Sequence, residues 1–304
     1  MVVRPEGAAI LGSAFAEEDI QTFALAGLLA LLSSPQEPTR DEIDRVVRAC
    51  AGSFLGKSSS FSMKTSLDTL DGVPVLVLDD EICGKETGFE VRRFRTFCRK
   101  DAWLSPIRID YSLESHLPKA VREKKKIGEK VSITGSVSFG EDKAVLKVAA
   151  LEGWPDTDDR EFSEKAVRKL FDREQKLEPV ELGGQKIAFR TFEPALLRTA
   201  LLAEPKKGFL RAFVLPEDVV VKIRFASSRD EGDVRVVSFG SASYGLKTGP
   251  NGVETHVTAG ETLHGVEIKE NAIAGITWRR QPLDRVDDAK LAEFKRAGIA
   301  AVKD

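Results

Sequence analysis

The sequence predicts an α+β protein in which most strands are antiparallel. Apolar and polar residues alternate along many short segments, first between residues 70 and 155 and again between 207 and 280. Helical patterns are expected in the first fifty residues, in a short segment near residues 115–128, in a central stretch and at the C-terminus. The segments also lack the regular strand–helix alternation that a parallel sheet requires.

A small helical N-terminal segment is expected over residues 1–58. Its first helix follows the acidic residues of AEED and has apolar residues close to one face. Its second helix begins at Thr39, which forms a capping box with Glu42, and ends at Gly52. The Ser-rich stretch 57–65 is then expected to be a loop.

Residues 59–155 are expected to form an OB-like β-barrel. In order, the expected elements are strands in VPVLVLDDEI, GFEVRRFRTFCRK and SPIRIDYSL, a helix in SHLPKAVREKKKIG, and strands in KVSITGSVSFG and KAVLKVAALE. This order of three strands, one helix and two strands is that of an OB-fold. Many other α+β domains share the same order.

The remainder divides into a helical connector at 156–206 and a β-rich domain at 207–304. The second of these contains about six short strands separated by Gly, Asn, Asp and Pro turns, followed by a helix in DDAKLAEFKRAG. Short strands at such regular spacing indicate a C-terminal β-sandwich or barrel.

The amino-acid composition excludes several classes of protein function. The formal net charge is −2, so the chain as a whole is not a basic, polyanion-binding protein. The three cysteines show no CxxC spacing, which argues against a disulfide scaffold and a structural zinc site and suits a reducing compartment. The apolar segment 20–32 is too short to span a bilayer, and no signal peptide pattern precedes it. We therefore expect a cytoplasmic protein without a membrane partner.

A basic segment with interleaved aromatic residues is the main functional signal. Between residues 89 and 130 there are 12 Lys/Arg against 6 Asp/Glu. Single-stranded nucleic acid is bound in this way, with cations along the backbone and rings under the bases. The predicted interface consists of Arg92, Arg93, Phe94, Arg95, Arg99, Lys100, Trp103, Lys124, Lys125 and Lys126.

Structural roles also account for these residues. Strand alternation places Phe89, Val91 and Phe97 on one face, with Phe94 and Cys98 on the other. Such rings can fill a barrel core, and charged strand residues protect sheet edges from aggregation.

Gly56, Lys57 and Ser58 resemble the end of a phosphate-binding loop. A P-loop follows a buried parallel strand and opens a helix, whereas this stretch follows a predicted helix and precedes poor helix formers. The alternative is that the glycines end a helix and Lys57 is a solvated side chain.

Two sets of residues are candidate ligands of a divalent metal. Asp79, Asp80 and Glu81 end an apolar strand and offer the oxygen ligands that Mg²⁺ or Ca²⁺ prefers. His256 and His264 flank a predicted Gly turn, which can place them opposite each other. Carboxylates that emerge into solvent at a strand end and histidines at the surface explain the two sets better, so no cofactor is predicted and a divalent metal stays an alternative.

Three hypotheses follow. The first is favoured because the basic segment with aromatic residues is the main functional signal, and the absence of a nucleophile motif argues against an enzyme. The chain is a non-catalytic protein that binds single-stranded DNA or RNA through the basic barrel face. The alternative is a structural or assembly protein that acts through protein–protein contacts, with another protein or as a homo-oligomer. The third is an NTPase or a metal-dependent nuclease.

Overall fold

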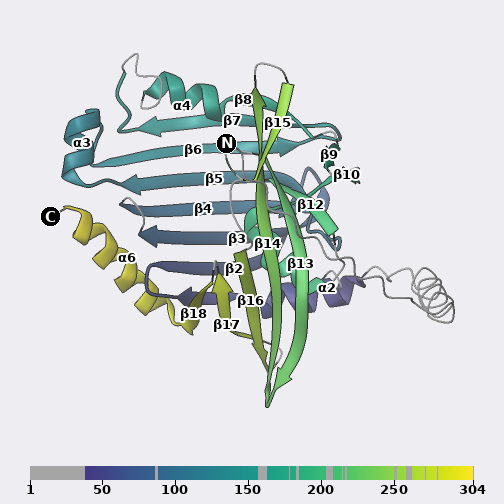
Figure 1. Cartoon of the computed structure of the whole chain (residues 1–304). Coiled ribbons are helices and arrows are strands. Elements are labelled where there is room, and N and C mark those ends of the chain that lie inside the picture. Colours follow the sequence, from purple (N-terminus) through teal and green to yellow (C-terminus); the bar gives the residue numbers. More distant parts are fainter. Residues whose placement is uncertain are drawn as a thin grey trace, which may run out of the picture. The chain divides into compact units, whose positions relative to one another are not determined.

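The computed structural model describes residues 38–304 apart from 86–87, 157–162, 178, 183–184, 203–207, 214, 216–217, 250–251, 258–261, 271, 279 and 304. Residues 38–304 form one compact unit (Figure 1). The first predicted helix lies in residues 1–37, outside the described residues. The helices are α2 (Arg40–Ala49), α3 (Lys119–Lys125), α4 (Glu164–Phe171), η1 (Glu193–Ala195, a 3₁₀ turn), α5 (Leu196–Leu202) and α6 (Asp288–Lys303).

The strands of the first half are β1 (Gly52–Leu55), β2 (Ser59–Leu70), β3 (Val73–Lys85), β4 (Phe89–Cys98), β5 (Pro106–His116), β6 (Lys130–Phe139), β7 (Lys143–Glu152) and β8 (Arg173–Lys176). Those of the second half are β9 (Val180–Leu182), β10 (Gln185–Ile187), β11 (Phe189–Phe192), β12 (Gly208–Phe213), β13 (Asp218–Glu231), β14 (Val234–Gly249), β15 (Gly252–Val257), β16 (Thr262–Lys269), β17 (Ala272–Trp278) and β18 (Gln281–Val286). The predicted α+β class with mostly antiparallel strands is confirmed.

Strands from both halves of the chain belong to one sheet. Its order is β11-β12-β13-β14-β16-β17-β18-β1-β2-β3-β4-β5-β6-β7-β8, with β15 pairing β14 off this path. Among these pairs only β11–β12 is parallel. The two halves join where β1 pairs β18, with Ser53 opposite Val286.

The sheet is not closed, so the predicted OB-like barrel is not confirmed. Strands β2 to β7 form a simple meander in which each pairs the next, and β5 pairs β6 directly across the α3 connection. The C-terminal strands continue the same sheet through β18 and β1, so the described strands do not form a separate sandwich. The division of the chain into four segments stays a prediction.

Two local predictions differ from the structure. The expected loop at 57–65 is mostly strand β2, because SFSMKTS alternates apolar and polar residues: Phe61 and Met63 are buried while Lys64 is exposed. The connector at 156–206 contains α4 and α5, but it also contains β8 to β11.

Helix α2 forms as its capping signal predicts. The Glu42 backbone N–H donates to Thr39 Oγ1 (3.2 Å) at its start. Its buried residues Ile43 and Val47 pack with Leu76 and Leu78 of β3.

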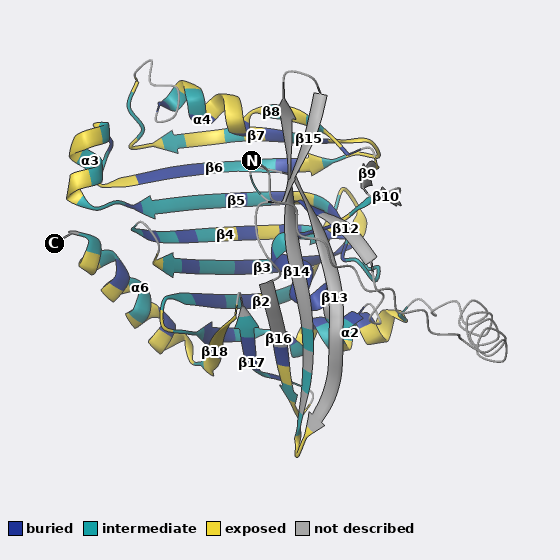
Figure 2. Cartoon of the chain, in the orientation of Figure 1, coloured by how far each residue is buried: buried dark blue, intermediate teal, exposed yellow. Residues whose placement is uncertain are grey.

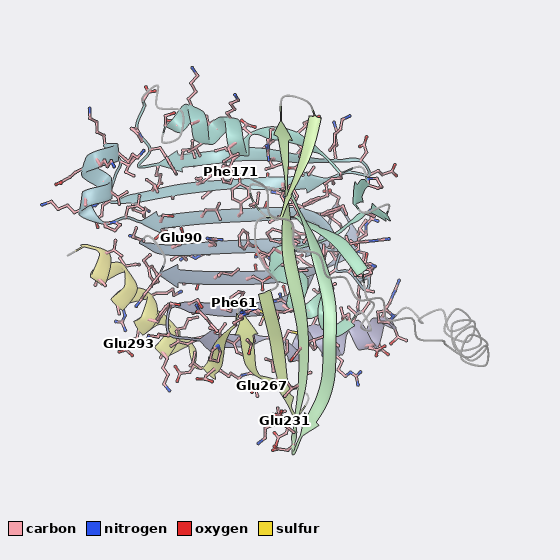
Figure 3. All side chains as sticks on the ribbon, in the orientation of Figure 1. Phe61, Glu90, Phe171, Glu231, Glu267 and Glu293 are labelled. Atoms are coloured by element: carbon pink, nitrogen blue, oxygen red, sulfur yellow. The ribbon has the colours of Figure 1, made fainter. Side chains whose placement is uncertain are left out.

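Helix α5 and strand β12 pack against one face of β1 to β7, which we call the core face. Leu196 and Leu197 of α5 join a cluster that contains Phe54 and Phe61. A second cluster contains Phe213 of β12, together with residues of β4 to β7 and of α4, including Phe171 (labelled in Figure 3). The core face is therefore covered by α2, which precedes it in the sequence, and by α4, α5 and β12, which follow it.

Cys50, Cys83 and Cys98 are free thiols with buried side chains. Burial raises the pKa of Cys50 to about 12 and of Cys83 to about 11, and it raises the pKa of Cys98 as well. None of the helices in the described part of the chain combines the length and apolar composition needed to span a bilayer.

Candidate functional site

The face of β2 to β5 opposite the core face carries charged residues, and we call it the charged face. Strand alternation decides which side chains reach it. On β3, Asp79 and Glu81 point to the charged face, whereas Asp80 between them is buried on the core face. Figure 3 shows the side chains on these strands.

The register aligns the charged residues in two rows that cross four strands. Asp79 of β3 lies opposite both Lys64 of β2 and Arg95 of β4, and Arg95 lies opposite Asp110 of β5. The signs along this first row are therefore plus, minus, plus, minus. The second row runs Ser62, Glu81, Arg93, Ser112.

The charges of the rows remain partly exposed. Arg93 Nε–H donates to Glu81 Oε2 (2.8 Å), and Arg95 lies 3.9 Å from Asp79 and 3.7 Å from Asp68. The Arg95 side chain is still 48% exposed. Because exposed pairs such as Arg95–Asp79 contribute only about 0–1 kcal/mol, these two charges can exchange partners at an interface. The Glu81 side chain is only 18% exposed and is held in the chain.

A hollow of about 570 Å³ lies over the two rows. Asp288, Leu291 and Lys295 of α6 line it beside the row residues. Its lining contains four basic residues, Lys64, Arg93, Arg95 and Lys295, and on the charged face four acidic ones, Asp79, Glu81, Asp110 and Asp288. The site is thus charged but electrically balanced.

Helix α6 is fixed to the charged face by apolar and polar contacts. Phe294 packs on Phe89 of β4 with ring centroids 5.8 Å apart. Lys295 Nζ donates to Glu81 Oε1 (2.7 Å), and Ser53 Oγ donates to Asp288 Oδ1 (2.7 Å). Figure 2 shows both exposed and buried residues along α6.

Replacing Gly298 of α6 with alanine is expected to destabilise the docking of α6 by about 1–3 kcal/mol. A methyl group there would overlap the Phe89 ring, which is fully buried and held by Phe294. This overlap outweighs the gain of about 1 kcal/mol in helix propensity. Hydrogen exchange of the α6 amides should become faster.

Two controls test this substitution, one at the same Gly298–Phe89 contact and one at another position of α6. Gly298→Ala combined with Phe89→Leu should recover slow exchange, and Ala300→Ser at an exposed position should leave exchange unchanged. Unchanged exchange in Gly298→Ala would show that the close approach does not limit docking.

The residues predicted to bind nucleic acid do not lie on one surface in the structure. Phe94 is only 7% exposed and packs edge-on against Phe192 on the core face. Trp103 is half-buried against the core, with the Arg190 guanidinium 5.7 Å from its ring centroid. Phe94 is therefore covered by the core, whereas Trp103 is partly exposed.

The predicted cations are also divided. Arg93 and Arg95 lie on the charged face, whereas Arg92 pairs Glu90 through a 2.6 Å contact near the core side. Lys100 pairs Asp44 of α2. Of the rest, Arg99, Lys124 and Lys126 are exposed, and Lys125 is half-buried on α3.

Gly56, Lys57 and Ser58 connect two antiparallel strands, β1 and β2. A strand and not a helix follows Ser58, so the strand–loop–helix arrangement of a phosphate loop is not formed here. The Ser58 hydroxyl donates to Gln281 Oε1 (2.9 Å), and Lys57 is exposed.

The two predicted metal sets are not brought together. Asp79 and Glu81 are separated from Asp80 by the sheet itself. His256 on β15 pairs Gly245 of β14, and His264 on β16 pairs Phe239 of β14, so the backbone does not place the two histidines opposite each other. Their side chains are not among those that the structure describes. Among the described residues, no group of three or more His, Cys, Asp or Glu side chains is arranged to hold a metal ion.

Asp80 instead forms a buried ion pair with Arg198 of α5. The guanidinium donates to both carboxylate oxygens, at 2.7 and 3.1 Å, and Arg198 is 0% exposed. Burial raises the pKa of Asp80, and the positive charge of Arg198 opposes that rise. The pair ties α5 to the core face of β3.

Lys64, Asp110 and Lys295 belong to the site but were missed by sequence reasoning. The sequence did contain a signal for Lys64 and Asp110: in SMKTS and IRIDYS, alternation of apolar and polar residues places each charge on the polar face of a strand. Lys295 has no such signal, since α6 is more than 200 residues from β3. Comparison with protein-family models, curated proteins and solved structures gives no match for this chain.

Proposed function

We propose that this chain is a structural or assembly protein, and that its charged face is a contact surface for another protein chain. The observation that carries the proposal is the row Lys64–Asp79–Arg95–Asp110. It presents alternating, half-exposed charges on a firmly paired sheet. Such a pattern suits a partner of complementary alternating charge, because electrostatic complementarity gives an interface specificity and register.

The balance of charge favours a protein over a nucleic acid at this face. A phosphate backbone laid along the rows would meet Asp79, Glu81 and Asp110 as often as the basic residues. Nucleic-acid affinity depends on neutralising phosphates with clustered cations. The burial of Phe94 also removes the expected stacking ring.

The test compares two variants with equal changes of charge. The face variant replaces Lys64, Asp79, Arg95 and Asp110 with serine. The matched control replaces two exposed ion pairs elsewhere, Lys119–Glu123 and Lys143–Glu174, with serine. Both variants lose two basic and two acidic side chains.

The wild type and both variants are used to capture binding proteins from a lysate of the cells that produce the chain. Each captured protein is then purified and its affinity for the three proteins is measured by titration. Self-association of the chain is measured in the same way. We expect a partner that binds the wild type and the control with equal affinity and the face variant at least about tenfold more weakly. A tenfold loss corresponds to about 1.4 kcal/mol. Equal binding by the face variant, or no protein partner at all, would contradict the proposal.

Nucleic-acid binding is the second candidate, and it is favoured by the exposed basic residues of α3. Lys124 and Lys126 point into solvent at its C-terminal end. Fluorescence anisotropy with labelled single-stranded DNA and RNA tests this candidate. Binding that falls steeply with salt and is lost in Lys124→Ser with Lys126→Ser would support it.

A further inference from the structure

We propose that a cleft on the core face binds a small amphipathic amine, which has an apolar body and a positively charged ammonium head. The cleft lies on the side of the sheet opposite the charged face, so this inference goes beyond the proposed function and does not rest on it. It consists of two hollows of about 270 and about 200 Å³ that share four lining residues: Ile82, Glu90, Arg92 and Glu193.

The floor of the cleft consists of two rows of residues that cross the sheet where β3 ends and β4 begins. The register of the strands places Ile82 beside Arg92 in the first row. In the second row, Glu90 lies between Gly84 of β3 and Ser115 of β5. Figure 3 labels Glu90 on this floor. The carboxylate of the second row therefore has small residues on both sides, which leaves room above the sheet.

Gly84 marks the open part of this floor. A Cβ atom added at Gly84 would have no protein atom within 4 Å apart from its chain neighbours. The φ angle of Gly84 lies outside the left-handed region, so its backbone accepts other residues. A larger side chain at this position would therefore extend into the cleft without straining the strand.

One end of the cleft is lined by apolar side chains that the core covers only in part. Leu113, Trp154 and Leu215 are partly exposed, although each packs against the apolar cluster beside them. The Phe192 ring of β11 borders the same end. The Trp154 indole is held in place, because its Nε1–H donates to the Ser132 backbone oxygen (3.2 Å). An open surface of aromatic and aliphatic groups suits the apolar body of a ligand.

The described residues that line the cleft carry a net negative charge. Glu90, Glu193 and Arg92 line both hollows and provide two carboxylates against one guanidinium. Glu114 and Lys85 border one hollow each and add one charge of each sign. The excess of one carboxylate favours a cationic ligand.

An anionic ligand fits these contacts poorly. Arg92 donates to Glu90 Oε2 through Nε (3.1 Å) and through Nη2 (2.6 Å), so its guanidinium is already engaged by a carboxylate. A ligand carboxylate at this place would lie near both Glu90 and Glu193, and like charges repel each other at close range. An ammonium group is attracted by these carboxylates, and the ring faces of Trp154 and Phe192 attract a cation as well.

The second hollow supplies further acceptors for the ammonium head. Ser58, Ser59 and Gln281 line it, and the Ser58 hydroxyl donates to Gln281 Oε1. An ammonium group has three N–H donors and no acceptor. Hydroxyl and amide oxygens beside a carboxylate are the groups that such a head requires.

The test is a two-dimensional NMR titration of the full chain at neutral pH with three probes of equal chain length: hexylammonium, hexanol and hexanoate. The amine carries its charge at this pH, as the lysine side chain does with a pKa of about 10.4. We expect hexylammonium to bind at least about tenfold more tightly than the other two probes. The signals that move should include the Gly84 amide and the Trp154 indole N–H.

Two variants and one control separate the cleft from other sites. Gly84→Leu fills the cleft and should abolish the shifts, while its thermal unfolding midpoint stays close to that of the wild type. Glu90→Gln keeps the shape of the cleft and should weaken hexylammonium binding by at least about tenfold without changing hexanol binding. Glu174→Gln neutralises an exposed carboxylate that pairs with Lys143, and it should bind as the wild type does.

Each other outcome overturns the inference. Tighter binding of hexanoate would show that the cleft recognises an anion, and equal binding of all three probes that it recognises only the apolar chain. Shifts that persist in Gly84→Leu would place the ligand elsewhere. If Gly84→Leu does not fold, Glu90→Gln decides the question, since unchanged affinity for hexylammonium excludes recognition by this carboxylate. Absence of hexylammonium binding to the wild type excludes the site.

Discussion

Replacing Arg198 with alanine is expected to lower the free energy of unfolding by about 3–5 kcal/mol. The substitution leaves the carboxylate of Asp80 buried on the core face without the guanidinium that now donates to both of its oxygens. A buried charge without a partner is among the most destabilising changes in a protein core. Urea unfolding followed by circular dichroism measures the change.

The loss should depend on pH in a defined direction. Burial already raises the pKa of Asp80, and removing Arg198 takes away the interaction that opposes this rise. A raised carboxyl pKa in the folded state gives stability below the unfolded value of about 4 and loses it as pH rises. The variant should therefore lose less stability at pH 4–5 than at pH 7.

The control removes both charges together. Asp80→Leu combined with Arg198→Met should be much less destabilising than Arg198→Ala, because no unpaired charge remains. A loss below about 1 kcal/mol in Arg198→Ala alone would mean that the pair does not hold α5 to the sheet.

Replacing Phe213 with alanine is expected to cost about 3–5 kcal/mol and to weaken the sheet as a whole. Phe213 of β12 is fully buried and packs edge-on against Phe139 of β6, with centroids 5.3 Å apart. The cavity would lie where the second half of the chain covers the first. Chemical unfolding should shift as a single transition.

Leu67→Ala is the matched control, since Leu67 is a large apolar residue that is 65% exposed. Its effect should stay within about 0.5 kcal/mol. If Phe213→Ala destabilised only residues 207–304 and left a separate transition for β2 to β7, the shared core would not hold the halves together.

Local elements were predictable where one physical signal dominates. The capping box of Thr39 and Glu42 located α2, and alternation located β3 to β7 with their turns. Strand β2 was missed because serine-rich alternation resembles a loop when the apolar residues are few. The pairing of Ser53 with Val286 could not be predicted, since no local signal links residues so far apart.

The residues of the site could likewise be predicted only in part from the local sequence pattern. Alternation correctly places Phe94 and Cys98 on one face, with Phe89, Val91 and Phe97 on the other. It does not say which face is covered, because β4 has apolar residues on both. That choice depends on β11 and β12, which cover Phe94, and on α6, which covers Phe89. An interface predicted from composition alone therefore combined residues from two opposite faces.

The three buried thiols make the chain a convenient background for distance measurements. Because all three cysteines are buried with raised pKa values, a maleimide or nitroxide reagent at neutral pH should react slowly with the native protein. A single cysteine introduced on the exposed surface would then be the one fast-reacting position. Spectroscopic probes attached there can report intermolecular separations without deletion of any native cysteine.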